Sequence, residues 1–144
     1  MADTAKSVYI RQIASFHTQG NPTVLKWFNK GSTTTNYLFT TAGNEGQSLL
    51  PHMANSPSTS AATSFKPASG AKFGFKIDNE YSDDKKNTTS GGGHHVRFYP
   101  IRDHNGNILA NQYFMVMDYS IAGSQNYDFQ DSVYVVGNIK PAGN

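Results

Sequence analysis

Apolar and polar residues alternate in short runs along most of the chain, and glycine, asparagine or proline bounds most of these runs. The clearest run is 72–77 (KFGFKI), in which Phe73, Phe75 and Ile77 alternate with lysine and glycine. A period of two places the three apolar side chains on one face of a strand and the other residues on the opposite face. The pattern therefore predicts a half-buried β-strand.

Similar runs predict further strands at 8–17, 23–28, 36–41, 95–100, 112–119 and 132–139. The first run changes phase between Ile10 and Ile13, which indicates a β-bulge or a bend. The Asn105-Gly106 dipeptide is typical of a hairpin turn. We therefore expect 95–100 and 112–119 to pair with each other.

Within 95–100 the alternation turns Val96 and Phe98 towards the core. His95, Arg97 and Tyr99 then share the other face of this strand. We expect His95 to be a packed, hydrogen-bonded residue and not a metal ligand.

Three segments lack the alternation and are predicted to lie outside the strands. Residues 42–70 are rich in serine, alanine and proline, and we expect a long surface excursion with room for one short helical turn. Residues 78–93 are strongly polar and predict a loop, and 121–125 predict a second, shorter loop. Long excursions of this kind are usually functional or mobile.

The composition supports an all-β fold. The 144 residues include 14 Ser, 12 Thr, 13 Asn and 13 Gly but only 5 Leu, so strong helix formers are scarce. No segment predicts a convincing helix. We therefore expect a single domain over residues 1–144, built as an antiparallel β-sandwich of the jelly-roll type with seven to eight strands.

Charge and cysteine content exclude several classes of function. The net charge of +2 is too small for a nucleic-acid or membrane-surface footprint, and no apolar run is long enough for a membrane span. The absence of cysteine excludes disulfides and cysteine-based metal sites. The first residues do not resemble a signal peptide, but the Asn/Thr/Ser-rich, weakly charged composition favours a mature extracellular or cell-surface domain.

Acidic and amide residues cluster between the last two predicted strands. Asp118 ends one strand, and Asn126, Asp128 and Asp131 follow before the next. Crowded carboxylates repel one another unless a cation or hydrogen-bond donors neutralise them, and Ca²⁺ prefers such oxygen ligands. The spacing is not that of an EF-hand. A turn whose side chains bond their own backbone is the alternative.

Three blocks, KFGFKID (72–78), HHVRFYPIRDHNGN (94–107) and NQYFMVMDY…NYDFQDSVYVVGNI (111–139), resemble a family of bacterial extracellular domains, largely of unknown function. That family carries a His-Val-Arg-x-Tyr-Pro strand and an Asp-Tyr-Asn-Asp-x-Val-Phe-type strand entry. The resemblance covers about residues 70–140. It implies a secreted β-sandwich with calcium at the acidic turn. The calcium ligands that it implies are Asp118, Asn126, Asp128 and Asp131.

The chain departs from the family pattern at two positions. The family usually has glutamate where this chain has Met117, and asparagine where it has Gln130. The resemblance therefore implies a calcium site with one potential ligand fewer than is usual in the family.

Several aromatic residues are candidates for a ligand surface, because sandwich modules hold carbohydrate by stacking sugar rings on Trp and Tyr. The candidates are Trp27, Tyr81, Tyr127 and the neighbouring cation Arg97. The alternative is that the rings fill the edges of the core or form cross-strand pairs. For Arg97 an ion pair with Asp118 on the neighbouring strand is expected in preference to ligand binding.

No residues predict catalysis. The only glutamates, Glu45 and Glu80, lie in polar segments, and the chain has no nucleophile elbow or zinc-protease helix motif. We therefore expect a non-catalytic, calcium-stabilised binding or adhesion module, with glycans or cell-surface polymers as ligands. The alternative is a structural or assembly domain, in which calcium is purely structural and the chain contacts other protein chains or itself.

Overall fold

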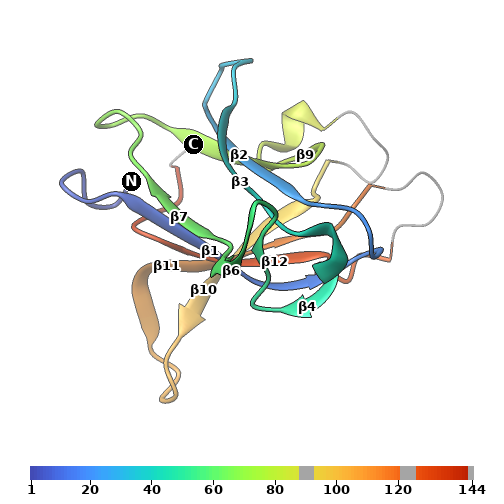
Figure 1. Ribbon diagram of the computed structural model, residues 1–144. Coiled ribbons are helices and arrows are strands. Elements are labelled where there is room, and N and C mark those ends of the chain that lie inside the picture. Colours follow the sequence, from blue (N-terminus) through green and yellow to red (C-terminus); the bar gives the residue numbers. More distant parts are fainter. Residues whose placement is uncertain (88–92, 121–125, 143–144) are drawn as a thin grey trace.

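The computed structural model describes residues 1–87, 93–120 and 126–142, and in these ranges the chain is built mainly of antiparallel strands (Figure 1). The predicted all-β class is confirmed. The loop predicted at 121–125 and part of the one predicted at 78–93 lie outside the described residues. Within these ranges, no helix is long and apolar enough to cross a membrane.

The larger sheet has six strands. Its order is β10 (Val96–Arg102), β11 (Ile108–Met117), β12 (Ser132–Gly137) and β1 (Val8–Phe16), and then two short strands, β4 (Gln47–Leu49) and β7 (Ala62–Phe65). Both short strands pair with β1, β7 along its first half and β4 along its last residues. The neighbours β10, β11 and β12 form a meander.

The smaller sheet has the order β3 (Asn36–Thr40), β2 (Val24–Asn29), β8 (Phe73–Ile77) and β9 (Glu80–Tyr81). A separate hairpin is formed by β5 (His52–Met53) and β6 (Ser56–Ser60), and two 3₁₀ turns, η1 (Gly43–Glu45) and η2 (Asp84–Lys86), complete the described elements.

The two larger sheets pack face to face and share one hydrophobic core. Its fully buried members come from both sheets and include Ile10, Leu25, Phe39, Ile77, Met115, Met117, Tyr134 and Val136. Alternate residues of each strand point into this layer, as the period of two requires. The sandwich is therefore confirmed, whereas the more specific jelly-roll connectivity is not established by this strand order.

Local details of the predicted strands can be compared with the structure. The register of β1 against β12 shifts between Gln12 and Ala14, where the sequence changes phase, so the predicted bulge is confirmed. Val96 is buried as predicted. Phe98 was expected in the core, but it remains 36% exposed because it lines a groove that is open to solvent.

The segment 42–70 contains more regular structure than its composition suggests. Its strands β4 and β7 extend the larger sheet, and η1 supplies the short helical turn. Ala61 of this segment is fully buried, and its carbonyl accepts the N–H of Gln12 at 2.9 Å. Backbone pairing along the free side of β1 holds this segment. Such pairing needs no apolar alternation, and the sequence pattern therefore does not reveal it.

Candidate functional site: an acidic end and an aromatic groove

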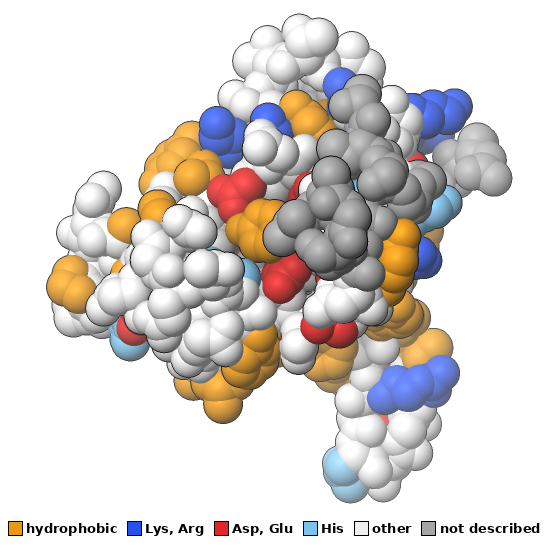
Figure 2. Space-filling view, turned by 90° about the vertical axis from the view of Figure 1, so that its right-hand side faces the viewer, with side chains coloured by type: hydrophobic (Ala, Val, Ile, Leu, Met, Phe, Trp, Pro, Cys, Tyr) orange, Lys and Arg blue, Asp and Glu red, His pale blue; other side chains and the backbone are white. Residues whose placement is uncertain are grey.

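Carboxylates gather at one end of the sandwich, where β8, β11 and β12 meet. Asp118 directly follows β11 and Asp131 directly precedes β12, while Asp78 directly follows β8 and Glu80 is the first residue of β9. With the nearby Asp128, these residues form what we call the acidic end. Figure 2 shows acidic side chains close together on one face of the molecule.

Tyr119 connects the two sheets at the acidic end. Its hydroxyl donates to Oδ2 of Asp78 in the smaller sheet, and its backbone N–H donates to Oδ2 of Asp131 at 2.8 Å. The ring also makes an edge contact with His17, with centroids 5.9 Å apart. Burial, together with the hydrogen bond to and the charge of Asp78, raises the pKa of Tyr119 well above its ordinary value.

Asp78 and Glu80 have hydrogen-bond donors within the protein. Besides the hydroxyl of Tyr119, Asp78 accepts the N–H of Val24 at 2.8 Å. Glu80, expected in a polar loop, is almost fully buried and accepts both the N–H of Ser120 at 3.0 Å and its hydroxyl at 2.5 Å. These two carboxylates therefore have a structural role in joining the β8–β9 turn to the segment after β11.

Asp118 differs from these carboxylates, because it is buried and poorly supplied with donors. It is 1% exposed, and neither carboxylate oxygen accepts a hydrogen bond of normal geometry in the described part of the chain. Burial raises the pKa of Asp118, and the charges of Asp131 and Asp128 raise it further. His95 and the backbone N–H of Tyr127 offset part of this effect.

The pKa of Asp131 is also raised, although Asp131 is less buried than Asp118. It is half-buried, and burial raises its pKa above the ordinary value despite the hydrogen bond from Tyr119 N–H. The charge of Asp128 adds to this rise, and His17 opposes it. The charge of Asp128 thus acts on both Asp118 and Asp131, so the three carboxylates lie in one neighbourhood.

The other two predicted ligands lie in an exposed loop with internal hydrogen bonds. Asp128 accepts Nδ2 of Asn126 at 2.5 Å and Nε2 of Gln130 at 2.8 Å. Tyr127 and Phe129, which flank Asp128, both adopt left-handed backbone conformations, with φ of 55° and 53°. The self-bonded turn that the sequence allowed as an alternative therefore describes Asp128, while Asp118 and Asp131 lie outside that turn.

These positions do not form a ready-made metal centre. Among the described residues, no group of three His, Asp or Glu side chains is placed closely enough to hold a metal ion directly. The structure brings three predicted calcium ligands into one electrostatic neighbourhood, but Asp128 is engaged by amide groups and points its oxygens at them.

The predicted ligand-binding residues are not collected on one surface. Trp27 stacks on Phe65 with centroids 5.0 Å apart and packs against the core. Tyr81 makes an edge contact with Phe28 at 5.5 Å, and Lys76 lies over its ring at 4.8 Å. Both rings therefore have packing roles, as the alternative interpretation allowed.

Arg97 and Tyr127 lie instead near the acidic end. The guanidinium of Arg97 lies 4.9 Å from the ring centre of Phe129, and Tyr127 is 51% exposed in the same loop. The predicted ion pair between Arg97 and Asp118 is not among the ion pairs of the described residues, so that expectation was wrong. Arg97 is paired across the strands with Val116, whereas Asp118 bonds to the backbone of His95.

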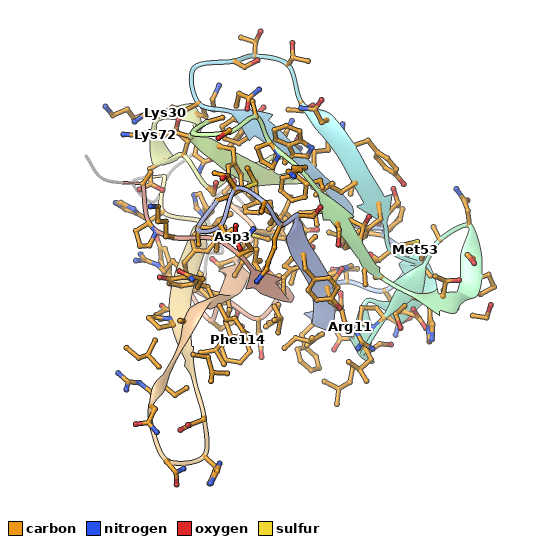
Figure 3. The ribbon with its side chains drawn as sticks, turned by 90° about the vertical axis from the view of Figure 1, so that its left-hand side faces the viewer. Asp3, Arg11, Lys30, Met53, Lys72 and Phe114 are labelled. Carbon is orange, nitrogen blue, oxygen red and sulfur yellow. The ribbon has the colours of Figure 1, made fainter. Side chains whose placement is uncertain are left out.

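The sequence did not predict a groove at the opposite end of the sandwich. The groove has a volume of about 530 Å³ and opens between the sheets, beside the N-terminal segment and the residues after β12. Figure 3 labels Lys72, which directly precedes β8, and Asp3 in the N-terminal segment. The lining residues include Lys72, Phe73, Phe75, Phe98, Tyr113 and Lys140. The only sequence signal for this groove was the alternation of β8.

Comparisons with protein-family models, curated protein sequences and solved structures found no match. The resemblance to the bacterial extracellular family and the calcium site that it implies therefore stay predictions.

Proposed function

We propose that the protein is a non-catalytic extracellular binding or adhesion module in which Ca²⁺ at the acidic end stabilises the sandwich. The observation that carries the calcium proposal is the environment of Asp118, a buried carboxylate whose oxygens accept no hydrogen bond of normal geometry and which lies close to two further carboxylates. Such a group must either take up a proton or be paired with a cation. Ca²⁺ is the hard cation that binds several carboxylate and amide oxygens together.

Four side chains would hold the ion. Asp118 and Asp131 are fixed by the ends of two paired strands, since Met117 of β11 is paired with Ser132 of β12. Asp128 and the side-chain oxygen of Asn126 would join them from the loop, which requires Asp128 to exchange its amide partners for the ion. The ion would then fix the crossing from β11 to β12.

The calcium site can be tested by thermal unfolding with Ca²⁺ and with chelator. At an ion concentration of about 100 Kd, binding to the native state adds about 2.7 kcal/mol, which corresponds to a melting temperature higher by ~5–10 °C. Asp118→Asn should melt higher than the wild type in chelator, because it removes an unpaired buried charge, and should lose most of the calcium effect. Asp103→Asn, in an exposed hairpin turn, is the matched control. Identical melting of the wild type with and without Ca²⁺ would contradict the proposal.

We place the glycan-binding surface on the loop 126–130 and Arg97. This surface combines an exposed ring, Tyr127, with the amide groups of Asn126 and Gln130 and the Arg97–Phe129 stack. Rings that stack on sugar faces next to polar groups that bond hydroxyls suit carbohydrate recognition. Trp27 and Tyr81 are left out of this surface because they pack within the sandwich.

A glycan array probed with and without chelator tests this surface. Tyr127→Ala and Arg97→Ala should each weaken binding by at least about tenfold, or ~1.4 kcal/mol. Tyr37→Ala is the control, because Tyr37 is exposed on the smaller sheet. Lack of any glycan binding in Ca²⁺ would overturn the glycan ligand and leave the calcium site standing.

An assembly domain is the second candidate function. It is favoured by β10, the edge strand of the larger sheet, which carries the exposed Tyr99, and by Ile108 at the tip of the hairpin with β11. An exposed edge with large apolar side chains is suited to pairing with another chain. Analytical ultracentrifugation over a wide concentration range should then show self-association that Ile108→Asn weakens. A monomer at every concentration would favour the binding module.

A further inference from the structure

Lysine side chains gather on the outer face of the smaller sheet. Lys76 of β8 places its Nζ 4.8 Å from the ring centre of Tyr81 in β9. Lys86 of η2 places its Nζ 5.7 Å from the same ring centre and 5.2 Å from that of Phe28 in β2. Two ammonium groups thus lie beside one ring. Figure 2 shows Lys and Arg side chains gathered towards the top of the molecule, where β2 and β9 lie in Figure 1.

The rings beneath these lysines are fixed by packing. Phe28 is 1% exposed and meets Tyr81 edge to face, with centroids 5.5 Å apart. Phe28 is paired with Gly74 of β8, and a Cβ atom at Gly74 would lie 2.7 Å from the Phe28 ring. The missing side chain therefore makes room for this ring. Lys86 is held further by a hydrogen bond from Nζ to the carbonyl of Ser32 at 2.9 Å.

A third lysine lies directly opposite Lys76. It is Lys26 of β2, and the next pair along the same two strands, Leu25 and Ile77, points into the core. Lys26 and Lys76 therefore leave the sheet on its outer face, with Cβ atoms about 4.5–5.5 Å apart. Like charges in directly opposite positions destabilise a sheet. We call Lys26, Lys76 and Lys86, all partly exposed, the lysine face.

No carboxylate neutralises the lysine face within the described ranges. The ion pairs there join Lys6 to Asp3, His52 to Glu45 and His94 to Asp84. Asp78 and Glu80 accept donors from the segment after β11, at the acidic end. The printed contacts of the lysine face are thus rings and one carbonyl, neither of which cancels a positive charge.

We propose that the lysine face binds an acidic polysaccharide through its sulfate or carboxylate groups. An anionic group next to the Tyr81 ring would meet the ammonium groups of Lys76 and Lys86 together. It would also relieve the repulsion between Lys76 and Lys26, because it adds a negative charge beside both. Charge complementarity therefore selects the anion.

The small extent of the lysine face favours a polysaccharide over a nucleic acid. The face covers three strands, β2, β8 and β9, or about 10 Å across. Duplex DNA carries one charge per about 1.7 Å and needs a longer basic stripe. A longer polyanion of that density would also meet the carboxylates of Asp78 and Glu80 at the ends of these strands. Acidic polysaccharides space their charges by whole sugar rings, which suits a compact patch.

The lysine face shares no residue with the loop 126–130 or with the four proposed calcium ligands. The inference is thus independent of both sites proposed above. In chelator, Tyr127→Ala should bind acidic polysaccharide like the wild type. Failure of this inference and failure of the loop surface can therefore be told apart.

Biolayer interferometry with three dextrans tests the proposal. Dextran sulfate, carboxymethyl dextran and uncharged dextran share one backbone, and chelator keeps calcium from bridging the polymers to the acidic end. We expect saturable binding of at least one charged dextran, at least tenfold tighter than that of uncharged dextran and weakened by added salt. The sulfate and carboxylate arms show which anion is preferred. Equal affinity for all three dextrans, or no saturable binding, would overturn the proposal.

Charge variants locate the binding face. Lys76→Gln/Lys86→Gln should weaken binding of the charged dextran about tenfold, whereas Lys76→Arg should keep it. Lys66→Gln/Lys140→Gln is the matched control, because these two lysines follow strands of the larger sheet, β7 and β12. If the first double variant were unfolded, Lys76→Gln alone should still weaken binding at least threefold. An equal loss in the control would overturn the assignment to the lysine face.

Lys26 gives a signature that a purely structural role would not produce. Lys26→Gln should raise the melting temperature without polymer, because it removes a like charge opposite Lys76, and should weaken binding of the charged dextran. A variant that binds like the wild type would remove Lys26 from the face. An oligothymidylate forms the last arm. Binding of this oligonucleotide as tight as that of the charged dextrans, and lost in Lys76→Gln/Lys86→Gln, would assign the face to nucleic acid and overturn the proposal.

Discussion

The two ends of the sandwich are closed by different physical means, although the same strands run to both. At the acidic end, the hydroxyl of Tyr119 and the N–H of Ser120 donate to Asp78 and Glu80 and so tie the smaller sheet to the segment after β11. At the groove end, the rings of Phe75 and Phe98 approach each other and leave a cavity open to solvent. A buried carboxylate at the acidic end needs a hydrogen-bond donor or a cation, whereas the aromatic rings at the groove end can leave a gap between the sheets without such a cost. Asp118, whose oxygens accept no hydrogen bond of normal geometry in the described part of the chain, departs from this rule and suggests a ligand at the acidic end.

The largest effect is expected from removing the ring that the core and the groove share. Phe75→Ala should lower the free energy of unfolding by ~3–5 kcal/mol, because Phe75 is almost fully buried between the sheets. Phe98→Ala should cost less than half as much, since that ring keeps part of its surface in water. Urea denaturation of both variants measures the difference. Equal losses would show that the groove end is packed as tightly as the core.

The hydrogen bonds that link the two sheets at the acidic end are tested by removing the hydroxyl oxygen of Tyr119. Tyr119→Phe deletes the hydroxyl that donates to Asp78, and we expect a loss of ~1–3 kcal/mol because a partly buried carboxylate oxygen loses its donor. Tyr99→Phe, on the exposed face of β10, should change stability by less than ~0.5 kcal/mol. If the two substitutions had equal effects, the link between the sheets at Tyr119 would carry no stability.

Calcium should act on one end only. Amide hydrogen exchange of Tyr119 N–H and Ser120 N–H, which bond Asp131 and Glu80, should slow by about tenfold in Ca²⁺, or ~1.4 kcal/mol of local stability. The N–H of Ala2, which bonds Asn138 at the groove end, should exchange at an unchanged rate. Uniform slowing at both ends would point to global stabilisation, and slowing at neither would contradict the calcium site.

The smallest effect concerns pH. Burial raises the pKa of Glu45, but its hydrogen bonds and charge interaction with His52 outweigh this, and the pKa lies below the usual 4.5. A carboxyl group with a lowered folded-state pKa stabilises the protein above its unfolded-state pKa, and this contribution disappears as the pH falls through the folded-state value. Glu45→Gln should therefore flatten the fall in stability below about pH 4.5, by less than ~1 kcal/mol. A wild-type slope in the variant would contradict the role of this pair.

Alternation revealed the strands that bury one face, but not the strands that are held by backbone pairing alone. The run at 72–77 and the change of phase in 8–17 predicted β8 and the bulge of β1, because a one-residue shift would expose the apolar face. Strands β4, β5, β6, β7 and β9 were missed. Serine, threonine and proline give β6 and β7 little period-two signal, and the other three strands have only two or three residues each.

The candidate sites divide in the same way. Asp118 and Asp131 could be brought together from the sequence, because both flank strands that pair with each other. Asp78 and Glu80 approach them from the smaller sheet through Tyr119 and Ser120. Lys72 and Lys140, far apart in the sequence, line the same groove. How two sheets face each other is not encoded in the period of either strand, and these partners were therefore beyond prediction.

The pairing of β1 with β12 has a mechanical consequence for a domain proposed to act in adhesion. The first residues of β1 lie opposite the last residues of β12, with Tyr9 paired to Gly137. A pulling force applied at residue 7 and residue 138 would therefore open this ladder one pair at a time instead of shearing all pairs together. The side chain of Asn138 donates hydrogen bonds to the carbonyls of Asp3, Lys6 and Ser7. Such a force would have to break these hydrogen bonds first.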